Sequence, residues 1–189
     1  DSTCCESCIP ISNVNDFTNL LQNDSSSLNY ILMNDIDLNG DSISRLFSNG
    51  FSGTFNGNGF EIKNFNIDLP STNNVGLFAK LNDSGEIKNL GIAGIGSISG
   101  SYNVGGLVGN NDGGEITYCY NAMKGSISGY NHVGGLVGNN SGEIRNCYNA
   151  MIGNISGNNE IGGLVGKNDS LNITYCYNAM KGSISGYNH

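Results

Sequence analysis

The sequence predicts an all-β fold, a right-handed parallel β-helix (β-solenoid) with about 28–29 residues in each coil. Three observations predict it: apolar residues recur at a fixed period, each repeat unit holds three short apolar stretches, and Gly, Asn and Asp separate them. These stretches are too short and too rich in glycine to form helices. As brief strands they would stack in parallel from coil to coil, and parallel crossovers favour the right hand.

Five rows of equivalent residues share one register, with steps of 28 or 29 residues in the clear repeats. The rows are Val75, Val104, Val133 and Ile161; Ile87, Ile116, Ile144 and Ile173; Ile98, Ile127, Ile155 and Ile184; Leu90, Cys119, Cys147 and Cys176; and Ala93, Ala122, Ala150 and Ala179. Residues 117–132 and 174–189 are identical. Because one unit cannot bury its own apolar edge, we expect the units to stack and to fold as one array.

Before the repeats, residues 1–27 are predicted to form a cysteine-containing segment with a short capping helix, and residues 28–189 the solenoid, clearest over 74–189. In the helix, Ser12 or Asn13 can serve as N-cap. Its apolar face would consist of Val14, Phe17, Leu20 and Leu21. Such a helix would cover the open edge of the first coil, and open edges invite aggregation.

The stretch between the helix and the clear repeats is predicted to be an adapted start of the same column. YILMNDIDLNG alternates as a strand does. Residues 51–68 match the repeat loosely, with Ile62 and Phe65 spaced like Ile87 and Leu90. We therefore expect Ile62 and Phe65 to occupy the same rows as these two residues.

The last coil is predicted to be unfinished. The sequence stops at Tyr187, Asn188 and His189, where the next unit would begin, and no polar or helical cap follows. The expectation is that this edge meets either further repeats or another subunit.

The repeated GGLVG at residues 105–109, 134–138 and 162–166, followed by small polar residues and then by EIxxCYNA or a close relative, resembles the GLUG motif. Residues 75–92 are a degenerate form, and NDSLNIT in the third repeat lacks the glutamate. The resemblance covers roughly residues 28–189. It implies a right-handed β-helix in secreted or surface-anchored proteins, including adhesin-like proteins and non-catalytic regions of metallopeptidases that cleave immunoglobulin A. It implies no activity for the repeat itself.

The composition narrows the classes of partner. The chain has 189 residues and a net charge of −8, which disfavours nucleic acid. Charged residues make up 13% of the chain, too few for a disordered acidic tail. No apolar run is long enough to span a membrane, so no membrane insertion is expected.

No catalytic motif stands out. There is no HExxH, and the two histidines, His132 and His189, occupy equivalent turn positions. Glu86, Glu115 and Glu143 form a periodic ladder, whereas a glycosidase or lyase site is local and unrepeated. The ladder is therefore interpreted as solvated turn positions, and we expect no enzyme activity and no catalytic residues.

No cofactor is expected, apart from two alternatives for weak Ca²⁺ binding. Adjacent carboxylates of the glutamate ladder would repel one another less with Ca²⁺ between them. Asp35, Asp37 and Asp41 in NDIDLNGD resemble part of a calcium loop but lack its distal glutamate.

The six cysteines fall into two sets. They are Cys4, Cys5 and Cys8 at the N-terminus, and Cys119, Cys147 and Cys176 in the repeats. The first set predicts an oxidised clip and indicates an extracellular setting, because a zinc site would need four convergent ligands. The second set occupies an apolar row, which predicts buried thiols. The alternative is that one of them pairs with a cysteine of the first set, in this chain or in a neighbouring one.

Two aromatic and polar rows remain. Tyr120, Tyr148 and Tyr177 would bind sugar rings or a partner protein if exposed, and core or half-buried positions are favoured for them. A second row holds Asn64, Asn89, Asn146, Tyr118 and Tyr175. Each follows an apolar residue by two positions, where asparagine tolerates the left-handed backbone conformation.

Candidate glycosylation sequons begin at Asn23, Asn82, Asn139, Asn154, Asn168 and Asn172. Their number is about what the asparagine-rich and serine-rich composition gives by chance, so they offer an opportunity for glycans and no evidence of them.

These observations favour an extracellular structural or adhesive repeat protein that forms a rigid rod and assembles end to end into a filament. The alternative is a ligand-binding stalk module of a larger surface adhesin or secreted peptidase. The expected location is extracellular or at the cell surface. The expected partners are further copies of the chain, as a homopolymer, or host and cell-surface ligands.

Overall fold

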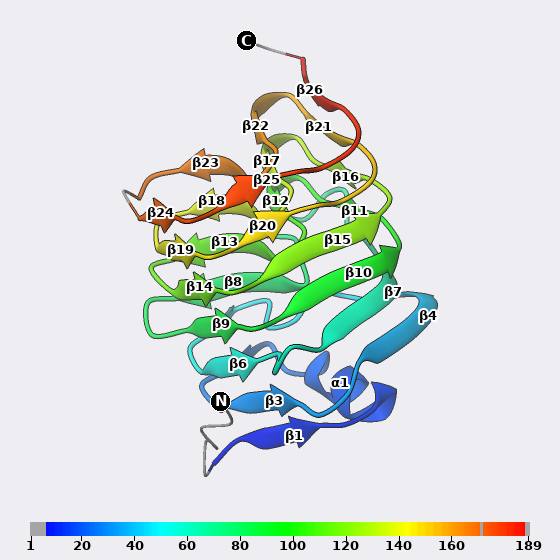
Figure 1. Cartoon of the computed structure of the whole chain (residues 1–189), viewed down its shortest axis with the longest axis vertical. Coiled ribbons are helices and arrows are strands. Elements are labelled where there is room, and N and C mark those ends of the chain that lie inside the picture. Colours follow the sequence, from blue (N-terminus) through cyan, green and yellow to red (C-terminus); the bar gives the residue numbers. More distant parts are fainter. Residues whose placement is uncertain (1–6, 171, 188–189) are drawn as a thin grey trace.

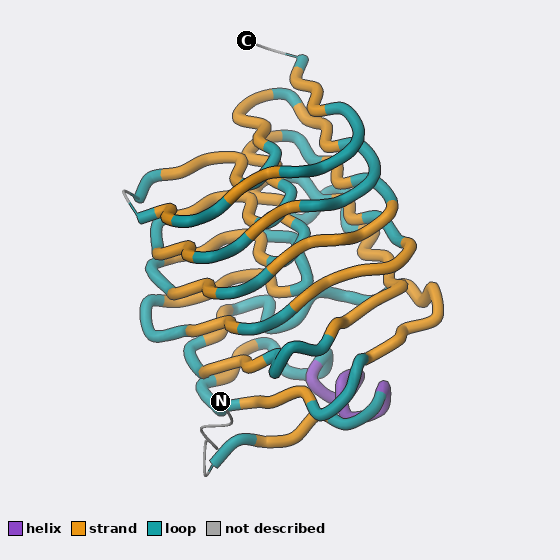
Figure 2. Tube along the Cα trace, in the orientation of Figure 1, coloured by secondary structure: helices purple, strands orange, loops and turns teal. Residues whose placement is uncertain are grey.

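The computed structural model describes residues 7–170 and 172–187 and shows a right-handed parallel β-solenoid, with the described N-terminal coil at one end of the column and the last coil at the other (Figures 1 and 2). The strands form a seven-stranded sheet, a six-stranded sheet, a three-stranded sheet and a ten-stranded sheet that folds around a corner. Pairings between named strands in this part of the chain are parallel. This confirms the predicted fold class.

The first coil consists of β1 (Ile9–Ile11), α1 (Val14–Leu20) and β2 (Ser25–Ser26). Because β1 already pairs with β3 and β2 with β5, the solenoid sheets begin before residue 28, the predicted boundary. The helix lies at the N-terminal end of the column beside β4 (Figure 1). Of the two predicted N-caps, Asn13 is the one used, and its side chain accepts a hydrogen bond from the Asp16 N–H.

The predicted apolar face of α1 is only partly correct. Phe17 and Leu20 are buried, and Leu21 is partly buried against the core. Val14 is 37% exposed, because side chains lean towards the N-terminus of a helix and no turn precedes this first residue to shield it.

The next two coils hold long and irregular elements. They are β3 (Tyr30–Leu32), β4 (Ile36–Ser42), β5 (Gly50–Phe51), β6 (Thr54–Asn56), β7 (Glu61–Asp68) and β8 (Phe78–Asn82). The long strand β7 pairs with β10 through its first residues and with β11 through its last. It therefore joins two faces of the column into the ten-stranded sheet.

The remaining coils are short and regular. They consist of β9 (Glu86–Lys88), β10 (Gly91–Ile95), β11 (Ile98–Ser99), β12 (Tyr102–Gly105) and β13 (Val108–Asp112); β14 (Glu115–Thr117), β15 (Tyr120–Lys124), β16 (Ile127–Ser128), β17 (Asn131–Gly134) and β18 (Val137–Asn140); β19 (Glu143–Arg145), β20 (Tyr148–Asn149), β21 (Ile155–Gly157), β22 (Asn159–Gly162) and β23 (Val165–Asn168); and β24 (Ile173–Thr174), β25 (Tyr177–Asn178) and β26 (Ile184–Gly186).

The predicted rows are confirmed where strands pair. Ile87, Ile116, Ile144 and Ile173 lie opposite one another in successive strands of the seven-stranded sheet. The rows that contain Val104 and Ile127 are in register in the same way. Ala93 pairs with Ala122. Equivalent side chains are therefore stacked directly, as the period requires.

One predicted match is wrong. Residues 51–68 are not in the register that the sequence suggests, because Phe55 lies opposite Ile87 and Ile62 lies opposite Ile92. Phe65 lies opposite Asp41, outside the row of Leu90. The tripeptide Glu-Ile-Lys occurs in both β7 and β9 and suggested the false match. The inward position of Phe55 in the preceding strand decides the true register.

The interior changes along the column. Phe47, Phe51, Phe55 and Phe78 are fully buried in the early coils, with the Phe47 and Phe51 rings stacked at 4.8 Å. In the regular coils the core consists of smaller side chains such as Leu107, and it includes fully buried asparagines. In the last described coil the equivalent apolar residues are partly buried or exposed. They include Ile161, Leu164, Val165, Ile173, Met180 and Ile184.

Candidate functional site

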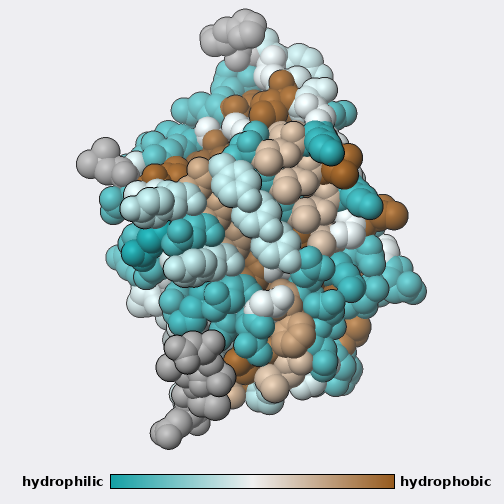
Figure 3. Space-filling model, viewed as in Figure 1, coloured by the Kyte–Doolittle hydropathy of each residue, from teal (hydrophilic) through white to brown (hydrophobic). Residues whose placement is uncertain are grey.

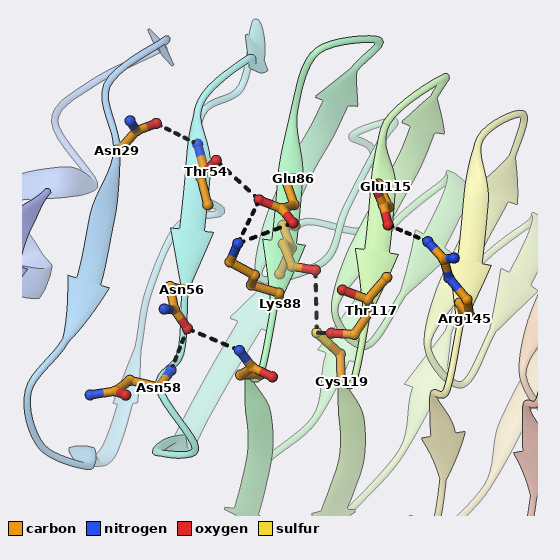
Figure 4. A network of polar contacts seen from close by, with 12 residues as sticks. Asn29, Thr54, Asn56, Asn58, Glu86, Lys88, Glu115, Thr117, Cys119 and Arg145 are labelled. Carbon is orange, nitrogen blue, oxygen red and sulfur yellow. Dashed lines mark hydrogen bonds and ion pairs between the residues drawn. The ribbon is translucent and has the colours of Figure 1, made fainter. Parts of the chain in front are cut away.

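The glutamate ladder lies along one edge of the seven-stranded sheet, and Figure 4 shows the polar contacts around it. Glu115 and Glu143 both contact the Arg145 guanidinium, at 2.5 and 3.2 Å. Glu86 lies 3.0 Å from Lys88 and accepts a hydrogen bond from Thr54. The carboxylates therefore have basic partners in the neighbouring row, an arrangement that ties coils together rather than one that concentrates negative charge.

Two of the three aspartates with calcium-loop character, Asp35 and Asp37, have separate partners. Asp35 pairs with Lys63 at 3.1 Å and accepts the Glu61 N–H, and this backbone hydrogen bond lowers the pKa of Asp35. A hydrogen bond from Asn64 lowers the pKa of Asp37. Across residues 7–170 and 172–187, no group of three or more His, Cys, Asp or Glu side chains has a metal-binding arrangement. Calcium binding stays a prediction.

His132 belongs to a vertical row of left-handed residues that also holds Asn74, Asn103 and Glu160. Its Nδ1 lies 2.6 Å from the Asn103 side-chain oxygen and its Nε2 lies 2.6 Å from the Glu160 carboxylate. The His132 ring therefore links three successive coils and helps to hold the column together. The other predicted histidine, His189, lies outside the described residues.

The repeat cysteines have free thiols, with Cys119 and Cys147 buried and Cys176 partly buried. The Cys119 N–H points at the Cys147 sulfur, 3.4 Å away, and the same contact recurs between Cys147 and Cys176. Burial raises the pKa of the Cys119 thiol. The row therefore consists of free thiols, two of them in the apolar interior, and the alternative pairing with an N-terminal cysteine of a neighbouring chain stays a prediction. The proposed clip stays a prediction, because Cys4 and Cys5 lie outside the described residues.

The sequons differ in how their side-chain amides are used. The amides of Asn82, Asn139 and Asn168 donate hydrogen bonds to neighbouring groups. The side chains of Asn23, Asn154 and Asn172 are exposed. Asn168 is exposed as well, so these four positions are the accessible ones if glycans are present.

Two inward-facing asparagine ladders join successive coils through side-chain hydrogen bonds. They were not predicted from the sequence. Asn111 donates to the Asn140 side-chain oxygen at 2.8 Å, and Asn140 donates to Asn168 at 2.9 Å. Asn149 donates to Asn178 at 3.1 Å in a parallel row that also contains Asn121. The recurrence of asparagine in GNN and CYNA could have revealed these ladders. It did not stand out, because the whole chain is rich in asparagine.

The tyrosine row forms an outward-facing ladder on the ten-stranded sheet. The rings of Tyr120, Tyr148 and Tyr177 are parallel within 5°, with centroids 5.1 Å apart. Tyr120 and Tyr148 are half-buried and Tyr177 is 56% exposed, which confirms the half-buried prediction for the first two. The Tyr120 hydroxyl donates to Glu61 at 2.6 Å. Burial raises the pKa of Tyr120, and the hydrogen bond to Glu61 raises it further.

The left-handed corner beside this ladder holds four predicted members of its row, Asn89, Tyr118, Asn146 and Tyr175, with φ of 53–54°. The fifth member of this row is Gly57, and not Asn64 as predicted, because the Gly57 N–H donates to the Lys88 carbonyl as the Asn89 N–H donates to the Thr117 carbonyl. Asn64 is also left-handed, but it lies in β7 beside Gly94 and Asp37. The error is the same register error that misplaced Ile62.

The GLUG motif matches residues 100–128 and 129–156, two adjacent units of the column. The chain is therefore a solenoid that contains two GLUG repeats. No curated protein matches its sequence. In shape the GLUG-repeat solenoid is similar to a crystal structure of a proposed immunoglobulin A1 protease from Bacteroides ovatus, at a TM-score of 0.52 and 20% identity, over 98% of this chain and 68% of the other. At that identity the likeness shows the fold alone.

The structure adds units that the motif match leaves out. β8 pairs with β13 and β23 pairs with β18, so the degenerate unit at residues 75–92 and the third repeat continue the same column. No described helix is both long and apolar enough to cross a membrane.

Proposed function

We propose that this GLUG-repeat solenoid is a non-catalytic structural module of an extracellular surface protein or secreted peptidase, and that its column works as a rigid rod. One observation carries the proposal: the periodic polar residues that could have been catalytic connect one coil to the next. Arg145 bridges two glutamates and His132 connects Asn103 to Glu160. Side chains occupied in this way stiffen a column and leave little free for catalysis.

The rod is tested by adding a coil. In-frame duplication of residues 129–156 should lengthen the particle by about 4.8 Å, the spacing of stacked strands, without loss of folding. Small-angle X-ray scattering measures the length and circular dichroism the folding. An aggregated or partly unfolded product would contradict the rod, because a modular column accepts a further unit of the same register.

Two further experiments test whether the chain is non-catalytic and whether it is extracellular. The B. ovatus neighbour is a proposed immunoglobulin A1 protease. We expect the isolated chain to leave immunoglobulin A1 intact on a denaturing gel, whereas new heavy-chain fragments would overturn the non-catalytic assignment. Antibodies against the chain should label intact cells of the source organism. Labelling only after lysis would overturn the extracellular assignment.

End-to-end self-association is part of the rod proposal. Ile161, Leu164 and Ile173 of the last described coils are only partly buried, and a coil from a second copy in the same register would cover them. Negative-stain electron microscopy of concentrated protein should then show filaments one column wide. Particles of constant length at every concentration would count against end-to-end assembly.

The alternative function, a ligand-binding stalk, is favoured by one observation. Phenylalanine is confined to the interior or its margin, whereas Tyr118, Tyr130, Tyr175 and Tyr177 are exposed on the regular coils. Exposed tyrosines are typical of binding surfaces. Screening the chain against host glycans and extracellular proteins would distinguish a stalk that binds from a rod that does not.

A further inference from the structure

One outer face of the column carries a ridge. Tyr120 lies along the column axis rather than away from it, since its hydroxyl reaches Glu61 two coils below. Gly91, in the coil between them, leaves room for the ring, and a Cβ there would lie 2.3 Å from the Tyr120 Cζ atom. Tyr148 and Tyr177 repeat this pose in parallel. The three rings overlap like tiles and form a continuous ridge along the regular coils.

A furrow runs beside the ridge. Two residues after each tyrosine, the next outward position holds Ala122, Ala150 or Ala179, and the same row begins with Ala93. The intervening Asn121 and Asn149 are buried, so Ala122 and Ala150 are the outward residues between larger neighbours, whereas Ala93 at the start of the row is itself buried. Figure 3 views this face and shows a pale column beside a tan, more apolar column over β10, β15 and β20. The floor of the furrow is therefore narrow, apolar and repeated from coil to coil.

The far wall of the furrow combines apolar and cationic side chains. It consists of Ile95, Lys124, Ile152 and Lys181, in register. Ile95 is 72% exposed and Ile152 is 48% exposed. Within the described residues, Lys124 and Lys181 have no ion-pair partner, whereas Lys63, Lys80, Lys88, Arg145 and Lys167 have one. Exposed isoleucines and unpaired lysines on one face indicate a surface that a partner covers.

We propose that this face, defined by the tyrosine ridge, the alanine furrow and the isoleucine–lysine wall, binds the same face of a second copy, with the two columns side by side and parallel. A two-fold axis along the column, between ridge and furrow, places each copy's ridge in the other copy's furrow. A two-fold axis across the column would set ridge against ridge. Shape therefore selects the parallel arrangement, in which one patch serves both copies.

Cation–π pairing agrees with this arrangement. With the ridge in the furrow, the isoleucine–lysine wall of one copy lies against the corner row of the other. Lys124 then meets Tyr118 of the other copy at the same height, and Lys181 meets Tyr175. Tyr118 is 62% exposed and Tyr175 is 83% exposed, so both rings are available for cation–π contact.

A sugar ligand fits this face less well. Stacking a sugar requires open ring faces, but each ladder ring overlaps the next at 5.1 Å between centroids, and Tyr120 lies against Gly91. The bare isoleucines offer nothing to sugar hydroxyls. A second copy of the chain would contact the ridge, the furrow and the exposed isoleucines at the same time.

The size of the face predicts the strength of pairing. Rows lie about 6.8 Å apart and coils about 4.8 Å apart, so four rows over four coils cover on the order of 500 Å² per copy. Stable complexes bury about 800 Å² per partner, so pairing in this chain should be weak and reversible. Each added GLUG unit that repeats Tyr-Asn-Ala should extend the face and tighten the pairing.

The test is sedimentation velocity over a range of protein concentrations, because this pairing goes beyond the rod proposal and needs no cells. The wild-type chain should show a concentration-dependent dimer. The double variant Ala122→Arg with Ala150→Arg fills the furrow and should weaken the dimer at least tenfold. The matched control, Ser128→Arg with Ser156→Arg, adds the same charge to β16 and β21 on another face and should leave the dimer unchanged.

Several outcomes would overturn the proposal. They are a wild-type chain that stays monomeric at its solubility limit, equal effects of the two double variants, and a chain that stays monomeric while this face binds chitohexaose. Circular dichroism confirms that each variant folds, and a folded but monomeric chain would leave the rod itself intact. Duplication of residues 129–156 supplies a second measurement. It should tighten the dimer in the wild type but not with Ala122→Arg and Ala150→Arg in every copy of the unit.

Discussion

In the same interior rows, the early coils place apolar side chains and the GLUG coils place asparagines. In one row Phe51 and Leu81 are followed, strand by strand, by Asn111, Asn140 and Asn168. In another, Ile36, Ile62 and Ile92 are followed by Asn121, Asn149 and Asn178. The parallel pairing continues through both rows where the chemistry changes, and both kinds of side chain point inward from paired strands.

This difference teaches how a repetitive column keeps its order. Identical units, such as residues 117–132 and 174–189, give apolar packing little means to tell one pairing from a neighbouring one. A buried asparagine that donates to the next asparagine is costly to misplace, because a slip leaves its amide unpaired in the core. The irregular aromatic core of the early coils is unique in sequence and fixes where the column starts.

The largest expected effect breaks the aromatic core. Phe78→Ala removes a fully buried ring that contacts Phe47, Phe51 and Phe55, and should lower the free energy of unfolding by about 3–5 kcal/mol. Val108 occupies the next position of the same row, and Val108→Ala should cost about 2 kcal/mol. Urea denaturation followed by circular dichroism measures both. Equal costs would mean that the two regions do not differ as described.

The second prediction concerns the buried asparagines. Asn140→Leu removes the partner of Asn111 and leaves the Gly142 carbonyl without its donor, so it should cost about 1–3 kcal/mol for each orphaned group. Asn111→Leu also takes a donor from the Gly114 carbonyl and from the Asn140 side-chain oxygen, but it should cost less, because it removes a side-chain oxygen that is buried without a partner and Leu81 already precedes it in the row. Equilibrium unfolding of the two variants decides. If Asn111→Leu is the more damaging, the ladder does not work as a directional chain.

The third prediction concerns how the free energy of unfolding falls at alkaline pH. The pKa of Tyr120 is raised in the folded chain, so its contribution is fully present below about pH 10, where the unfolded tyrosine begins to ionise, and is lost as the pH rises further. The loss should stay below about 1 kcal/mol per pH unit, since the side chain is partly solvated. Tyr120→Phe should flatten the fall between pH 9 and 11 in urea titrations. Tyr130→Phe, on another face, serves as the control, and an equal flattening there would argue against the Glu61 hydrogen bond as the cause.

The smallest effect is a gain. Tyr118 adopts φ of 54°, a conformation that asparagine tolerates better than tyrosine. Tyr118→Asn, which copies Asn89 and Asn146 of the same row, should raise stability by about 0.5–1 kcal/mol and the melting temperature by about 2–4 °C. Differential scanning calorimetry measures the shift. Tyr148→Asn lies outside the left-handed corner and should give no gain, so a gain there would remove the backbone explanation.

Much of the fold follows from the sequence where the period is strict. The Ile116 row, the valine row, the Asn13 cap and the inward cysteines were predictable, since each depends on spacing or on local chemistry. The register of residues 51–68 was not, because a short tripeptide matched two strands and only packing around Phe55 distinguishes them. The inward asparagines were missed for another reason. Polar side chains are expected on the outside of a protein. They can be buried here only because the next coil supplies a hydrogen-bond partner.

By itself, the sequence determined the solenoid and its period, because the regular spacing of Val, Ile and Leu predicts that equivalent residues stack. Tertiary structure decided which polar rows face inward and which outward. It also decided that Tyr120 lies over Gly91 towards Glu61, and that the alanines form a furrow beside the rings. These features depend on contacts between coils, where each side chain meets residues about one repeat away, and no local pattern specifies such a neighbour before the column is assembled.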